Sequence, residues 1–170
     1  MNLIRHTILM LSLACSLIAG AAAADSISTE GVVSAPVAEV WTAFTTGAGL
    51  RSWMAPHADI DLRVDGLMRA HYKPDGTLGD GSTIVNKVLS FEPQRMLSIR
   101  VAKAPDDFPF PGAIMAMWSV VYFEDAGNST TRLRVVSMGF TPDAESQRMK
   151  AFFERGNAYT VMKLQEKFAK

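Results

Sequence analysis

Three side chains able to bind a metal ion follow one another at a spacing of two residues. From an extended strand, His57, Asp59 and Asp61 would point the same way and offer nitrogen and carboxylate ligands. Apolar Ile60 and Leu62 alternate with them, which places the His57 set on the solvated face of the strand. We therefore interpret the three as an exposed polar row and expect no metal site.

A second candidate for chemistry is the adjacent pair His71 and Tyr72. A histidine titrates near neutral pH, and a phenol can donate a hydrogen bond to a developing oxyanion. Only one of the two can face inward on a strand. Tyr72 shares its side with apolar Met68 and Ala70, whereas His71 shares its side with Arg69, so we predict Tyr72 inside and His71 outside. We favour a packing role for Tyr72 over a catalytic one, because buried tyrosines commonly anchor cores.

Other signatures of catalysis or cofactor binding are missing from the sequence. It contains no nucleophile elbow, phosphate-binding loop, dinucleotide fingerprint or zinc motif. Asn128-Ser129-Thr130 matches a glycosylation sequon, but it lies in a predicted hairpin turn, and we favour turn formation as its role. The chain has 17 basic and 17 acidic residues, so no basic field exists for nucleic acid. We expect no cofactor, no metal and no nucleic-acid partner.

Methionine and aromatic side chains are the more informative group. Methionine suits irregular apolar surfaces and adaptable pockets, and with aromatic residues it could line a chamber for a flexible, lipid-like guest. The alternative is that the same side chains form an ordinary solid core. The predicted lining comprises Trp41, Trp53, Met68, Tyr72, Phe110, Met115, Trp118, Phe152, Phe153 and Asn157.

The element that would close such a chamber is a long C-terminal helix, predicted over residues 141–170. Thr141 is the expected N-cap and Pro142 the first helical residue. Gly156 on the inner stripe suggests the close approach of a strand or a ligand, with a tolerated surface glycine as the alternative. The stripe repeats every three or four residues and consists of Met149, Phe153, Gly156, Thr160, Leu164 and Phe168.

The preceding residues alternate with a period of two and predict antiparallel strands. The first strand covers residues 26–33, and Pro36 then opens a short helix that Gly47 and Gly49 end. A second short helix is expected to begin in the apolar turn at residues 50–54. Further strands are predicted at residues 58–63, 67–73, 82–91, 97–101, 118–124 and 130–138. Residues 104–113 form an apolar, proline-rich loop that either plugs the sheet or closes a ligand chamber.

Residues 1–24 have the pattern of a secretory signal peptide. A short basic start precedes an apolar run and a series of small residues, and a cut after Ala24 satisfies the small-residue rule. Residues 25–170 would then form a single domain, periplasmic or secreted, without cysteine and without an integral membrane segment. A lipoprotein anchored through Cys15 is the less favoured alternative.

A series of short motifs, in order, resembles one known family. The motifs are Val33–Trp41, Leu50–Trp53, Asp65-Gly66, Phe91–Pro93, Thr131–Leu133 with Gly139-Phe140, and Phe153–Asn157. Together they resemble the homologues of the activator of the heat-shock protein 90 ATPase, within the START-related, or SRPBCC, superfamily. The resemblance spans nearly all of residues 26–168 and departs at Asp65-Gly66, where many members have two glycines.

The resemblance implies an α+β helix-grip fold, a curved antiparallel sheet wrapped around a long C-terminal helix, with two short helices after the first strand. It also implies a cavity between the sheet and that helix for an apolar or amphipathic small molecule. Our hypothesis is an exported, non-enzymatic protein that binds such a molecule there.

Two alternatives remain open. One is an enzyme resembling polyketide cyclases or aromatases, in which Tyr72 and Asn157 orient and polarise the substrate. The other is a protein-binding accessory factor that uses the outer face of the sheet. In either case an exported chain would not meet a cytosolic chaperone.

Overall fold

Seven strands form one antiparallel sheet in the computed structural model, which describes residues 25–169. The predicted signal peptide and Cys15 lie outside the described residues. The strand order is β1-β7-β6-β5-β4-β3-β2. The strands are β1 (Ser26–Val33), β2 (His57–Ile60), β3 (Leu67–His71), β4 (Ile84–Glu92), β5 (Met96–Lys103), β6 (Trp118–Gly127) and β7 (Thr130–Met138).

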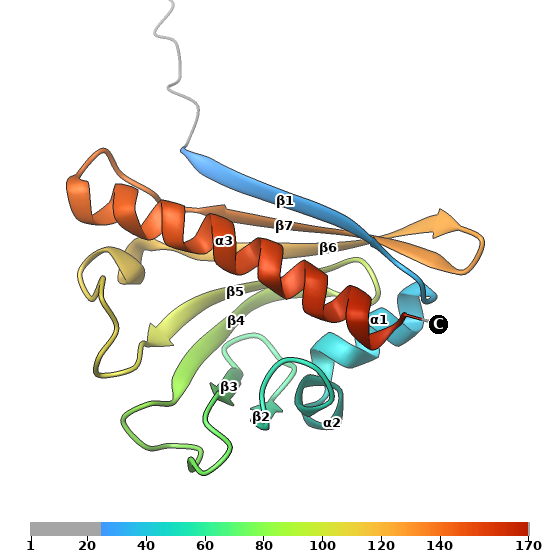
Figure 1. The fold of residues 1–170 in the computed structure, drawn as a ribbon, viewed down its shortest axis with the longest axis horizontal. Coiled ribbons are helices and arrows are strands. Elements are labelled where there is room, and N and C mark those ends of the chain that lie inside the picture. The colour runs from blue at the N-terminus through green and yellow to red at the C-terminus, as the bar shows by residue number, and fades with distance from the viewer. Residues whose placement is uncertain (1–24, 170) are drawn as a thin grey trace, which may run out of the picture.

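Helices lie on the concave side of this sheet (Figure 1). The long helix α3 (Ala144–Lys167) runs beside β1 and crosses the sheet diagonally, while α1 (Val37–Thr45) and α2 (Gly47–Arg51) follow β1 at one end. A short 3₁₀ turn, η1 (Ala113–Ala116), precedes β6. This confirms the helix-grip fold and the two short helices after the first strand. No helix in the described part of the chain is long and apolar enough to cross a membrane.

The first residues of α2 and α3 differ from the prediction. The cap of α3 is Asp143, whose carboxylate accepts a hydrogen bond from the Ser146 backbone N–H at 3.0 Å, and Pro142 lies before the helix. Thr141 is not the cap, because its hydroxyl instead donates to Asp143. Helix α2 begins at Gly47 rather than in the following apolar turn, since the Thr46 hydroxyl accepts the Gly49 N–H at 2.9 Å and caps it.

Close approach between α3 and the sheet occurs at Gly31, not at Gly156. A Cβ built on Gly31 would overlap Val161 of α3, whereas a Cβ on Gly156 would meet no protein atom within 4 Å. The prediction of a strand packed against Gly156 is therefore wrong. Met149 and Leu164 of the predicted stripe are fully buried, whereas the residues between them leave space beneath the helix.

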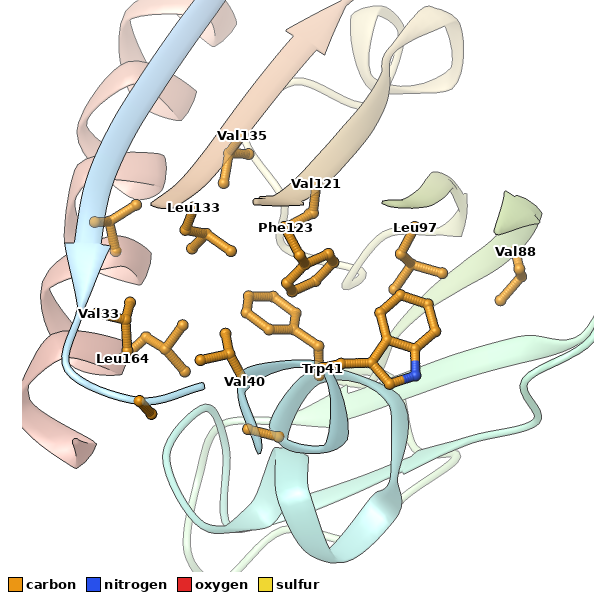
Figure 2. Packing of buried hydrophobic residues seen from close by; sticks show 14 residues of the cluster. Val33, Val40, Trp41, Val88, Leu97, Val121, Phe123, Leu133, Val135 and Leu164 are labelled. Atoms are coloured by element: carbon orange, nitrogen blue, oxygen red, sulfur yellow. The ribbon is translucent and has the colours of Figure 1, made fainter. Parts of the chain in front are cut away.

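The main core fills the region between α1, the sheet and the end of α3 (Figure 2). Trp41 and Phe44 of α1 each contact Phe123 of β6 edge-on, with ring centroids 5.3 Å apart in both pairs. Leu133 and Leu164 are fully buried beside them. These contacts form the main hydrophobic core of the fold.

Candidate functional site

Beyond that core, α3 and the sheet enclose open space. An inner hollow of about 180 Å³ lies against the strands, and an outer hollow of about 370 Å³ lies nearer the surface. We call the two together the cavity, because they share six lining residues: Met54, Tyr72, Ile84, Phe153, Asn157 and Thr160. Small-molecule sites typically have volumes of about 300–1,000 Å³, so the cavity has the size of a ligand site.

The wall of the inner hollow follows from strand alternation. Every second residue of a strand faces the same side, so β3 contributes Met68 and Ala70, and β5 contributes Leu97, Ile99 and Val101. β4 adds Ile84 and Asn86, β6 adds Ser119 and Val121, and β7 adds Val135. The surface is apolar apart from a few uncharged polar groups.

Aromatic side chains surround the outer hollow. Trp53, Phe108 and Phe152 line it, and the rings of Phe108 and Phe152 meet edge-on with centroids 5.9 Å apart. The Trp53 indole N–H donates to the Ala43 carbonyl at 3.0 Å, which fixes the ring at the mouth. Gly156 lines the same hollow, and its missing side chain leaves the space open.

The structure distributes the ten predicted lining residues unevenly. Six of them line the cavity: Trp53, Met68, Tyr72, Phe152, Phe153 and Asn157. Trp118 borders the inner hollow, but strand alternation puts its side chain on the face opposite Ser119. Three line neither hollow: Trp41 packs in the core, Phe110 stands behind Phe108 and Phe152, and Met115 is 45% exposed on η1.

The prediction that Tyr72 is a buried tyrosine packed in the core is wrong. Its side chain is 60% accessible to solvent, although it lines both hollows. These surroundings raise the pKa of the Tyr72 phenol above its ordinary value. The phenol is therefore protonated at neutral pH and can donate a hydrogen bond into the cavity.

His71 points to the opposite face but is not in solvent. It is 1% exposed, because the loop after β3 covers it: Nε2 lies 3.1 Å from the Asp80 carboxylate, and Nδ1 accepts the Lys73 N–H at 3.2 Å. The prediction that His71 lies outside is thus right about the face and wrong about exposure. The covering loop carries no apolar pattern that could have predicted this burial.

The polar row at His57 is divided among separate partners. His57 bonds the Pro74 carbonyl at 2.9 Å, and Asp59 forms an ion pair with Arg69. Asp61 pairs with the neighbouring Arg63 at 2.7 Å. Within residues 25–169, no three His, Cys, Asp or Glu side chains are grouped so as to hold a metal ion.

The helix-grip architecture and the enclosed hollow define the class of protein: an SRPBCC fold with a cavity under its C-terminal helix. Within that class, residues 34–169 match the model of the family described as Activator of Hsp90 ATPase homolog 1-like protein. The chain belongs to this family. No curated protein matches it in sequence.

Solved structures support the same assignment at the level of the fold. The Aha1 dimer from Colwellia psychrerythraea is 17% identical, with a TM-score of 0.64 over 85% of this chain and 96% of that one. Protein MLL2253 from Mesorhizobium loti is 23% identical, with a TM-score of 0.63 over 84% and 96% of the two chains. DynU16, a protein in the dynemicin biosynthetic locus, is 21% identical, with a TM-score of 0.62 over 84% and 46%.

Proposed function

We propose that this protein binds an apolar or amphipathic small molecule in the cavity between α3 and the sheet, and that it acts as a carrier rather than as an enzyme. The observation that supports this most is the unfilled space beneath Gly156 of α3. Replacing water in a sizeable apolar hollow by an apolar guest is favourable, because it removes apolar surface from water.

Filling the space beneath Gly156 tests the proposal. A Cβ at Gly156 would meet no protein atom within 4 Å, so Gly156→Leu should direct its side chain into the outer hollow, fold, and lose at least tenfold in affinity for the apolar fluorophore N-phenyl-1-naphthylamine. Gly156→Ala is the matched control, because its single methyl group leaves most of the volume free. Equal affinities of wild type and Gly156→Leu would count against the cavity as the binding site.

The second candidate is a cyclase-like enzyme. Tyr72 and Asn157 both line both hollows, and the Tyr72 phenol stays protonated at neutral pH, as a group that polarises a carbonyl must. Tyr72→Phe should then abolish turnover of an aromatic polyketide while leaving its binding intact. In a carrier, the same variant changes affinity alone.

Export to the periplasm or outside the cell is part of the proposal. Asp25, which follows the proposed cleavage site, pairs with Lys150 and accepts a hydrogen bond from Gln147 at 3.0 Å. A chain that began at Asp25 would therefore keep its first residue fixed to α3. The intact mass of the protein from the periplasmic fraction should correspond to residues 25–170; a mass that included residues 1–24 would contradict this.

A further inference from the structure

Three polar side chains from different elements form a hydrogen-bonded row beside the inner hollow. Ser119 of β6 and Ser137 of β7 are directly paired across the sheet, and their hydroxyl oxygens lie 2.8 Å apart. From α3, the Asn157 amide N–H donates to the Ser137 oxygen at 3.0 Å. Ser137 is fully buried and Asn157 is 8% exposed. Such a row in an apolar wall is costly unless its members find partners.

The positions of the hydrogen-bonding protons show which donor and acceptor atoms of this row have no partner. Either hydroxyl could donate in the Ser119–Ser137 bond, but Asn157 already donates to Ser137, and among the described residues the Ser119 oxygen is the one side-chain acceptor bonded to Ser137; we therefore assign Ser137 as the donor to Ser119. The proton of Ser119 then has no acceptor among residues 25–169, and Asn157 Oδ1 has no donor there. No fully buried side-chain nitrogen or oxygen of these residues is without a partner, so Asn157 Oδ1 must keep access to open space. Ser119 and Asn157 both line the inner hollow, which is that space.

Within the part of the chain that the structure describes, no charged side chain faces this row in the inner hollow; Lys163 lines only the outer hollow, where it pairs with Glu166 at 2.6 Å. The other inward polar side chains, Tyr72, Asn86 and Thr160, are uncharged at neutral pH. Arg100 borders the inner hollow, but its neighbours Ile99 and Val101 face inward, so alternation sends the guanidinium to the other face. An ionised group placed here would lose its hydration without gaining a counter-ion.

We propose that Ser119 and Asn157 form a subsite for the hydroxyl group of an uncharged, lipid-like alcohol; this rests on the proposed function. One hydroxyl group can donate to Asn157 Oδ1 and accept from Ser119, which matches both open atoms. The apolar body of the alcohol then lies along the methionine and aromatic walls toward the outer hollow. Ser137, which touches no ligand, is a positioning residue that orients both.

Displacement of N-phenyl-1-naphthylamine by three matched probes tests the subsite. Wild type should bind 1-dodecanol roughly tenfold more tightly than 1-methoxydodecane, which cannot donate a hydrogen bond, and more tightly than dodecanoate, which is charged. Ser119→Ala and Asn157→Leu should each lose most of the preference for the alcohol over the ether. Their affinity for the ether should stay close to that of wild type. Thr130→Val should keep the preference, because Thr130 of β7 lines neither hollow and its hydroxyl donates to the Gly127 carbonyl at 2.7 Å.

Equal affinities of wild type for alcohol and ether, tighter binding of dodecanoate, or a preference unchanged in both subsite variants would overturn the subsite while leaving the proposed function standing. Failure of wild type to bind the fluorophore or any of the three probes would overturn both. Circular dichroism of the variants separates lost binding from lost folding.

Discussion

Two glycines on facing elements have opposite surroundings. Gly31 of β1 lies where α3 comes closest to the sheet, so any side chain there must displace Val161. Gly156 of α3 faces the outer hollow, where nothing opposes a side chain. The first glycine serves the contact between helix and sheet, and the second keeps the cavity open.

This contrast predicts opposite effects on stability for the same substitution. Gly31→Ala should lower the free energy of unfolding by about 1–3 kcal/mol, because overpacking forces the helix or strand to shift. Gly156→Ala should raise it by about 1 kcal/mol, since alanine is the better helix former and meets no clash. Urea unfolding of both variants measures the two values. A neutral Gly31→Ala or a destabilised Gly156→Ala would contradict the packing described.

Polar residues of the site were the hardest to predict from sequence. Asn157 was predicted in the lining, but Ser119 and Asn86 were not, although they occupy inward positions of strands whose apolar neighbours were recognised. The available signal was their place in the alternation. Trp41, Phe110 and Met115 were selected by residue type, and type alone does not distinguish a core, a second layer or an exposed turn.

Among the helices and strands, the start of α3 depends on the carboxylate of Asp143. Asp143 caps α3 and receives hydrogen bonds from the Thr141 hydroxyl and the Ser146 N–H, which lower its pKa below the ordinary value of 3.8. Hydrogen bonds from Gln147 and Lys150 similarly lower the pKa of Asp25, which fixes β1 to α3. Both carboxylates favour the folded state while they are ionised.

Acid should therefore weaken the start of α3. A depressed pKa contributes stability above the unfolded value of 3.8, and the contribution is lost as the pH falls through the folded value. Asn caps helices about as well as Asp but does not titrate, so Asp143→Asn should be less stable than wild type at pH 6, and the difference should shrink as the pH falls below 3.8 toward 3. Urea midpoints at the two pH values measure the gap.

The exposed loop variant Asp107→Asn is the control, because no hydrogen bond to the Asp107 side chain exists among the described residues. It should follow wild type at both pH values. A difference between Asp143→Asn and wild type that stays constant from pH 6 to pH 3 would contradict the role assigned to Asp143.

Regular elements were predicted well because their periodicity is local. The alternation of Leu97, Ile99 and Val101 specified β5, and the spacing of Met149 and Leu164 specified the buried side of α3. The predicted starts of α2 and α3 differ from the observed ones by a few residues. Several nearby residues could act as the N-cap, and only the folded structure shows which one does. The burial of His71 depends on the loop that follows β3 and could not be predicted from the strand itself.

Across the whole molecule, the main core lies around α1 and Phe123, and the cavity lies under the middle of α3. Helix α1 fills the concave face near Phe123, whereas the middle of α3 spans the sheet above strands β3 to β7 without filling the space between. Proteins of different description share this architecture, so the proposed function rests on the cavity and not on the fold.

The central claim is that an apolar guest lies inside the cavity, and NMR of methionine-methyl-labelled protein tests it most directly. With N-phenyl-1-naphthylamine bound, intermolecular NOEs should connect the probe to the methyl groups of Met54 and Met68, which line the inner hollow, and not to exposed Met115. NOEs to Met115 alone, or none to Met54 and Met68 at saturating probe, would show that the guest binds elsewhere and would contradict the account.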